Sequence, residues 1–320
     1  MRIPRWVRVA AAAATLAAVV WRLGAGPFLD GVRAVDGRAL LAAAGIGLVT
    51  TLCCAWRWTV VARGLGVRLS LPAAVAAYYR SVFLNLTLPG GVAGDVHRGV
   101  SHGRDVHDVG RGMRIVAWER AAGQLVQAVL TIAVLLVLPS PVRSAMPLAA
   151  AGLVCVVVGL VLVSRLRPAG RSRWARLRNA VAADVRAGLL HRKALPAVVL
   201  ASAIVVIGHA VTFLVAARTA GVSAPSSRLL PLAFLVLLAG ALPSIAGWGP
   251  REGATAWVFA AAGLGATRGA ATAAAYGVMV VAASLPGALV LLAGRLSRRR
   301  LSSLIGRVAV VGRPEGAADA

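Results

Sequence analysis

The chain has 320 residues, of which 59% are hydrophobic and 14% charged, and its mean hydropathy is +0.81. This balance excludes an ordinary water-soluble domain. The formal net charge of +25 does not indicate a nucleic-acid-binding protein, because the basic residues gather at the ends of apolar blocks, where membrane proteins meet anionic headgroups.

The apolar blocks are long and lack the alternation of a transmembrane β-barrel, so the sequence predicts an all-α polytopic membrane protein. A helix that crosses the hydrocarbon needs about 20 apolar residues. The first suitable segment has a basic start and a short apolar run, as a signal peptide has, but the number of later spans favours a retained anchor. The predicted spans are residues 7–23, 39–62, 115–138, 147–164, 195–217 and 270–294.

Two further apolar segments, residues 71–89 and 230–266, each run into a break that is rich in proline and glycine and carries polar groups. Irregular backbone at membrane depth is tolerated where it lines a cavity, so we interpret both segments as re-entrant. Eight full crossings are the competing count. The fold prediction is therefore six to eight transmembrane helices with two re-entrant or broken segments.

The charges of the loops predict the orientation. Residues 165–193 hold nine basic residues against the single acid Asp184, which places this loop in the cytoplasm. An even number of crossings puts both termini on the same side of the membrane as this loop. We therefore expect a plasma-membrane protein with both termini in the cytoplasm. Residues 297–320 are expected to form a basic, disordered tail. The loops expected outside hold three, one and two basic residues, and they are residues 22–38, 139–146 and 218–229.

The order of predicted elements repeats along the chain. Residues 1–138 and 147–294 each give two spans, a re-entrant segment and a further span, and they begin on opposite sides of the membrane. The sequence therefore predicts two inverted repeats within one transmembrane domain, residues 1–296. The two breaks share a Leu-Pro step and an Ala-Gly step. Breaks at matching positions of two halves indicate a transporter-like binding site near the middle of the bilayer.

The first break carries polar residues beside its proline and glycines. Because proline ends a helix and glycine permits close or left-handed backbone, unpaired amides there can point into a cavity and receive an anionic headgroup. Arg98 is placed to hold a phosphate; alternatively, it belongs to a cytoplasmic turn and extends to lipid headgroups. The candidate binding residues are Tyr79, Arg80, Asn85, Gly90, Gly91, Asp95 and Arg98, and the structural breaks are Pro89 and Gly94.

The second break places the guanidinium of Arg251 and the carboxylate of Glu252 in an otherwise apolar region. Ionisable groups at membrane depth are costly to bury, so we interpret both as members of a binding site. In the alternative interpretation they cap or pin the break for the fold alone. The candidate binding residues are Trp248, Arg251 and Glu252, and the structural breaks are Pro243, Gly247 and Gly249.

The span at residues 115–138 opens with two adjacent candidates, Glu119 and Arg120. Neighbouring residues on a helix face different directions, so we expect these two to bind different partners. Glu119 fits a site residue and a buried structural charge equally well. Arg57, which lies between two tryptophans, is expected to be an interfacial anchor.

The sequence holds no phosphate-binding Gly-Lys-Ser/Thr loop, no Gly-x-Ser-x-Gly elbow and no clustered metal spacing. We therefore predict no catalytic residue, no metal and no cofactor. His97, His102 and His107 recur at a five-residue spacing, which does not keep one face of a helix. A solvated loop is expected there in preference to a metal site.

Over residues 7–296 these motifs together resemble the family named after the membrane domain of lysylphosphatidylglycerol synthase. The resemblance implies a role in lipid movement. In bifunctional members of that family, the membrane domain is thought to move aminoacylated phosphatidylglycerol between leaflets, while a separate soluble domain makes that lipid. We expect this chain to have the translocating function alone, without the tRNA-dependent synthesis. The resemblance depends on Arg57-Trp58, Tyr79-Arg80-Ser81, Asn85, Pro89-Gly90-Gly91, Gly94-Asp95, Arg98, Glu119-Arg120, Pro243, Gly247-Trp248-Gly249 and Arg251-Glu252-Gly253.

The leading hypothesis is a flippase-like protein that moves a phospholipid or a polyprenyl-phosphate-linked lipid. Its polar path would be lined by Arg98, Glu119, Arg251 and Glu252. One alternative is a membrane-embedded transferase or hydrolase of lipid headgroups, with Asp95, Glu119 or Glu252 as general base. Another is a partner-binding subunit that uses the basic loop of residues 165–193. The expected partners are membrane lipids and a lipid-modifying enzyme, and no nucleic acid.

Overall fold

The computed structural model describes residues 17, 20–21, 23–88, 90–165, 172–189, 191–192, 194–242 and 248–294. Within these residues the chain is helical and contains no β-strand. Most of the predicted span 7–23 lies outside the described residues. The same is true of the whole tail 297–320 and of Pro89, Pro243 and Gly247.

Five described helices are long and apolar enough to cross a membrane, and each coincides with a predicted span. The all-α membrane prediction is therefore confirmed. The helical stretch of α12 continues beyond a turn at Leu285 as far as Gly294. The five helices are α3 (Gly37–Gly64), α6 (Val109–Val137), α7 (Met146–Arg165, after the short η1, Arg143–Ala145), α9 (Ala194–Thr219) and α12 (Ala266–Ser284).

The two segments with breaks form helical hairpins. In the first, α4 (Leu71–Thr87) packs against α5 (Ala93–Asp105), and in the second, α10 (Ser226–Ala239) packs against α11 (Pro250–Ala261). Their lengths of 17, 13, 14 and 12 residues are below the roughly 20 that a crossing needs, which favours re-entrant hairpins. The order long helix, hairpin, long helix thus occurs twice in the described chain.

The expectation of a loop is wrong for His97 and His102, although His97 is exposed as expected. Both lie in α5, and His102 is buried with its ring edge-on to Trp58 at 5.3 Å between centroids. The helix approaches α6 closely because Gly103 faces Gly112 there, where a Cβ added at Gly112 would lie 2.6 Å from the Gly103 backbone. Because glycines make this contact, the sequence of α5 lacks the apolar stripe that a packed helix usually shows.

Two shorter helices lie in the connections between spans. The helix α2 (Gly26–Arg33) packs on α12. The basic loop contains α8 (Arg173–Asp184) and one π-helical turn, η2 (Val185–Leu189). The carboxylate of Asp184 accepts hydrogen bonds from Arg114 Nε at 3.0 Å and Trp118 Nε1 at 3.1 Å. This contact holds the basic loop against the beginning of α6.

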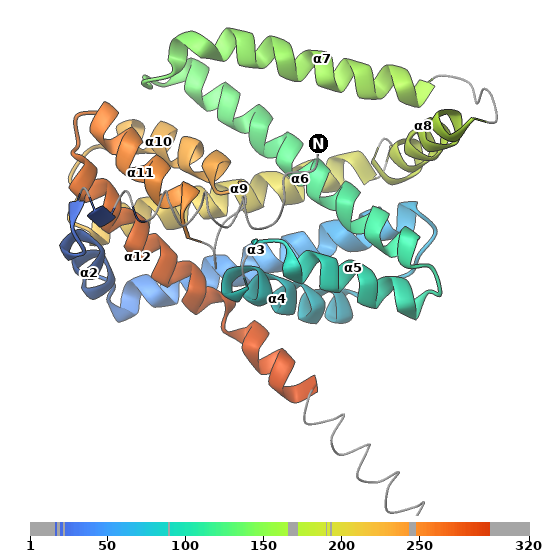
Figure 1. The fold of residues 1–320 in the computed structure, drawn as a ribbon, viewed down its shortest axis with the longest axis horizontal. Coiled ribbons are helices and arrows are strands. Elements are labelled where there is room, and N and C mark those ends of the chain that lie inside the picture. The colour runs from blue at the N-terminus through green and yellow to red at the C-terminus, as the bar shows by residue number, and fades with distance from the viewer. Residues whose placement is uncertain are drawn as a thin grey trace, which may run out of the picture.

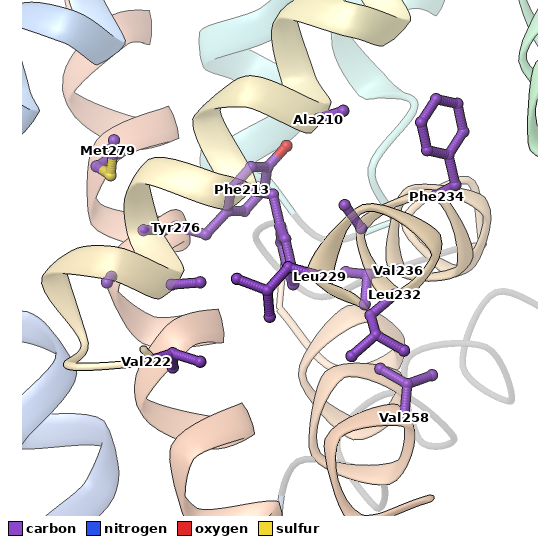
Figure 2. Packing of buried hydrophobic residues seen from close by; sticks show 14 of the residues in the cluster. Ala210, Phe213, Val222, Leu229, Leu232, Phe234, Val236, Val258, Tyr276 and Met279 are labelled. Carbon is purple, nitrogen blue, oxygen red and sulfur yellow. The ribbon is translucent and has the colours of Figure 1, made fainter. Parts of the chain in front are cut away.

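Apolar packing joins the second hairpin to the long helices α9 and α12. Phe213 on α9 lies 5.9 Å from the ring of Tyr276 and 6.3 Å from that of Phe259, measured between centroids. Leu229, Val258 and neighbouring residues complete this cluster (Figure 2). A second cluster, with Trp58 and Ile115, joins α3, the first hairpin and α6. Each hairpin is thus anchored to long helices by its own core.

The helix α7 lies apart from the long helices α3, α9 and α12 (Figure 1). It contacts chiefly α6 and α8, and most of its side chains are exposed. Since these side chains are almost all apolar, the surface of this helix is suited to contact with lipid.

The close approach of α5 to α4 gives a test of the first hairpin. A Cβ added at Gly94 would lie 1.9 Å from the backbone oxygen of Ser81, so Gly94→Ala should destabilise the protein by about 1–3 kcal/mol through overpacking. Gly152→Ala is the matched control, because no atom lies within 4 Å of a Cβ added there. Thermal unfolding in detergent measures both variants. Equal midpoints for the two would contradict the packing of this hairpin.

Candidate functional site

A buried carboxylate on α6 joins the helices of the first half. Glu119 is 0% exposed and accepts hydrogen bonds from Arg57 Nε on α3 at 2.9 Å and from Arg98 Nη2 on α5 at 2.9 Å. The hydroxyl of Tyr78 on α4 donates to the same carboxylate at 3.3 Å. One side chain therefore holds three neighbouring helices through charge-assisted hydrogen bonds.

A second carboxylate, Asp95, lies in the first turn of α5. It accepts hydrogen bonds from Arg120 Nε at 2.9 Å, Asn85 Nδ2 at 2.9 Å and Ser81 Oγ at 3.1 Å, and Arg98 Nη2 lies 3.1 Å away. A negative charge at this end of a helix is favoured by the helix dipole. Asp95 therefore ties the first break to both α4 and α6.

The backbone of the first break is held by a local cap. Asn85 Oδ1 accepts a hydrogen bond from the backbone N–H of Gly94 at 2.7 Å, at the beginning of α5. Gly90 and Gly91 have φ of 100° and 65°, a left-handed conformation that glycine adopts without steric cost. These glycines let the chain turn between α4 and α5 as the sequence predicts.

Arg98 lies in the protein interior and not at a headgroup boundary. It is 1% exposed, and its guanidinium carbon lies 4.3 Å from the ring centroid of Tyr78 and 4.5 Å from that of Trp58. Its Nε and Nη1 atoms are buried and have no hydrogen-bond partner among the described residues, whereas the guanidinium as a whole has cation–π contacts with the two rings. The alternative interpretation, in which Arg98 belongs to a cytoplasmic turn and extends to lipid headgroups, is therefore wrong.

Arg57 corrects another expectation. It is 5% exposed and donates from Nη1 to Ser202 Oγ on α9 at 2.8 Å, in addition to its ion pair with Glu119. It is therefore not an interfacial anchor, although the neighbouring Trp56 is exposed. Glu119 and Arg120 bind different partners, as their adjacent positions on the helix predict.

The second break is held by Glu252. Its carboxylate accepts a hydrogen bond from the backbone N–H of Gly249 at 2.6 Å, which caps the start of α11, and another from Arg251 Nε at 2.9 Å. Gly249 has a φ of 122°, which favours glycine. The guanidinium carbon of Arg251 lies 5.0 Å from the ring centroid of Tyr276 and 5.7 Å from that of Trp248. The geometry of Glu252 is that of a cap, the alternative role that its sequence position suggests.

Both breaks line one cavity of about 650 Å³, here called the break cavity. The first break and α6 contribute Asp95 and Arg120, and the second hairpin contributes Arg251. The wall also includes Gly90 and Gly91, and the apolar residues Val116, Leu237 and Leu242. Charged groups from both halves of the chain therefore meet at one hollow.

A second hollow of about 220 Å³, here called the central cavity, lies among α3, α4, α6, α9 and α12. Tyr79 and Arg57 are part of its wall, together with the hydroxyls of Thr50, Ser202 and Thr212. The two cavities are neighbours, because five residues belong to both walls. They are Arg120, Gln124, Gln127, His209 and Val280.

The predicted residues thus fall into two groups. Tyr79, Gly90, Gly91, Asp95, Arg120 and Arg251 line the cavities. Asn85, Arg98, Glu119 and Glu252 hold those residues and the breaks in place, with Gly94 at the hairpin contact and Trp248 beside Arg251. Arg80 is half-buried on α4.

Sequence reasoning missed His209 and Tyr276, which lie in the apolar spans of the second half. A polar, ionisable residue in the middle of an apolar span is itself a signal of a functional position, and this signal was available for His209.

The network has an excess of positive charge. Its first part contains Arg57, Arg98 and Arg120 against Asp95 and Glu119, three cations and two anions, which leaves one positive charge. Arg251 and Glu252 balance one another. In a low-dielectric interior such an excess attracts an anion. In the part of the chain that the structure describes, no three His, Cys, Asp or Glu side chains are close enough to share a metal ion.

A family model matches most of the chain. The family model described as "Lysylphosphatidylglycerol synthase TM region" matches residues 5–309, which include both hairpins and both cavities. No curated protein matches the chain.

The buried ion pairs predict a large difference between two carboxylate-to-amide substitutions. Glu119→Gln leaves Arg57 and Arg98 without their shared counter-charge and should lower the free energy of unfolding by about 3–5 kcal/mol. Asp108→Asn removes an exposed ion pair with Arg111 but keeps an oxygen to cap α6, so its cost should stay below about 1 kcal/mol. Unfolding by titration with a denaturing detergent compares the two. A small effect of Glu119→Gln would contradict the assignment of this network.

Proposed function

The chain belongs to the lysylphosphatidylglycerol synthase TM-region family, and from this membership we propose that it is a flippase-like protein that moves an anionic lipid between leaflets. The lipid is a phospholipid or a polyprenyl-phosphate-linked lipid. The protein acts in the plasma membrane with both termini in the cytoplasm.

The observation that carries this proposal is the break cavity, where Arg120 and Arg251 come from opposite halves of the chain. A phosphate between them would accept hydrogen bonds from two guanidinium groups, which favour planar, bidentate contacts with phosphate oxygens. Val116, Leu237 and Leu242 in the same wall suit the apolar part of a lipid next to its headgroup. The acyl chains stay in the hydrocarbon while the headgroup crosses.

The proposed orientation follows from loop charge and from one contact. Five described spans and the predicted span 7–23 make an even number of crossings. The basic loop carries the positive charge typical of the cytoplasmic side, and Asp184 binds it to the beginning of α6. In this orientation the first hairpin enters from the cytoplasm and the second from outside.

The state of the carboxylates favours transport over chemistry on the headgroup. A general base must be within reach of the proton it removes and have a pKa near the working pH. Asp95, Glu119 and Glu252 each lie in an ion pair with an arginine, and the last also caps α11. A transferase or hydrolase would have to break one of these pairs first.

Since the sequence holds no nucleotide-binding loop, lipid movement in this proposal is downhill, coupled to an ion or driven by another protein. A lipid-modifying enzyme that supplies the substrate is the partner that fits this function.

Reconstitution into vesicles with fluorescent phosphatidylglycerol tests the proposal. The protein should accelerate exchange between leaflets, and Arg251→Gln should slow it by about tenfold or more, since a charged hydrogen bond to the headgroup is lost. The matched control is Arg111→Gln, which changes an exposed arginine outside the cavities and should leave the exchange rate unchanged. Exchange no faster than in empty vesicles, for several anionic headgroups, would contradict transport.

Lipid mass spectrometry of cells that lack the protein separates the transporter from the enzyme. A transporter should change the distribution of a lipid between leaflets and leave its chemical structure intact. The loss of a modified lipid, together with accumulation of its unmodified precursor, would support the transferase instead.

A further inference from the structure

His209 occupies an unusual position between the two cavities. It lies in the middle part of α9 and contributes to the walls of both the break cavity and the central cavity. A ligand that enters either cavity therefore comes close to its imidazole ring.

The groups that surround His209 come from several helices. On α12, the hydroxyl of Tyr276 lies 3.2 Å from His209 Nδ1, and the guanidinium carbon of Arg251 on α11 lies 5.0 Å from the ring centroid of the same tyrosine. On α6, Arg120 and two glutamines share the cavity wall with His209. On α3, Cys54 and Arg57 line the central cavity, and on α4 the titratable liners are Tyr78 and Tyr79. On α5, Asp95 lines the break cavity, to which α10 contributes apolar residues.

The other ionisable groups of the walls do not exchange a proton readily near neutral pH. Arginine stays charged, and the ordinary pKa values of tyrosine and cysteine lie above the neutral range. Among the described residues that line the cavities, His209 is thus the one whose residue type ordinarily gains and loses a proton near neutral pH.

We propose that His209 couples proton binding to headgroup binding: it takes up a proton from cavity water when an anionic headgroup enters and releases it when the headgroup leaves. The proton goes to the ring nitrogen that lacks one. Because the Tyr276 hydroxyl can donate to a neutral ring and accept from a protonated ring, its contact with Nδ1 serves both states. The inference rests on the proposed function and adds a role for the proton in it.

The sign of the effect follows from charge. Protonated His209 adds a positive charge beside Arg120 and Arg251, so an anionic headgroup should bind more tightly as the pH falls. By reciprocity, a bound headgroup should favour protonation by the same factor. Headgroup binding and proton uptake are therefore two measurements of one coupling.

Isothermal titration calorimetry of the full chain in detergent tests the coupling, with short-chain phosphatidylglycerol as the probe. Affinity should be roughly tenfold higher at about pH 5.5 than at about pH 8. Repeating the titration in buffers of different ionisation enthalpy should show proton uptake on binding. His209→Gln, which keeps a polar side chain but cannot titrate, should bind with equal affinity at both pH values and without proton uptake.

Two further variants keep the test decisive. Tyr276→Phe should shift the midpoint of the pH dependence and preserve proton uptake, because it removes the hydroxyl and leaves the imidazole. His107→Asn is the matched control, since His107 is exposed with a φ of 55° that asparagine tolerates, and it should behave like the unmodified protein.

The possible failures are distinguishable. Binding whose pH dependence and proton uptake persist in His209→Gln, or binding without proton uptake in the unmodified chain, would overturn the role of His209 and leave the proposed function standing. No binding of phosphatidylglycerol at either pH, together with no leaflet exchange of any anionic lipid, would overturn the proposed function and this inference with it.

Discussion

The structure of the first half depends on two carboxylates buried in a low-dielectric interior among three guanidinium groups. Such charges are tolerated only when they are paired and hydrogen-bonded, so each must meet its partners in a fixed geometry. Glu119 meets Arg57 and Arg98, and Asp95 meets Arg98 and Arg120. The ion pairs therefore fix the tilt and depth of α5 against α3 and α6. They also leave Arg120 at the cavity wall with its guanidinium already oriented.

The second half holds its break by a different means. Glu252 caps α11 and pairs with the adjacent Arg251, while an apolar cluster around Phe213 anchors the hairpin. The two halves share an order of elements, but among the described residues only the first half contains a charge network that links several helices. This asymmetry leaves the first half with one excess positive charge, and Arg120 of that half lines the break cavity together with Arg251 and His209 of the second half.

Much of the fold follows from the sequence because hydrophobic length is a strong constraint in a membrane. The spans and the two breaks are visible as apolar runs and as clusters of glycine and proline. The partners of individual charges are not visible in this way. Arg57 between two tryptophans has the pattern of an interfacial anchor, yet its neighbours on the helix face other directions and the arginine reaches Glu119, which is 62 positions away. The helix α5 was not predicted, because glycines make its contacts with α4 and α6 and its sequence therefore lacks an apolar stripe. Pairings over such distances depend on how the helices pack, which composition and periodicity do not specify.

The central claim is that the two breaks bind one anionic headgroup between them. A structure in lipid nanodiscs that contain phosphatidylglycerol tests this directly, by the position of the bound phosphate. The account predicts a phosphate in the break cavity within hydrogen-bond distance of both Arg120 and Arg251. A phosphate bound to one of these arginines alone, or lipid found only on the outer surface of the helices, would contradict it.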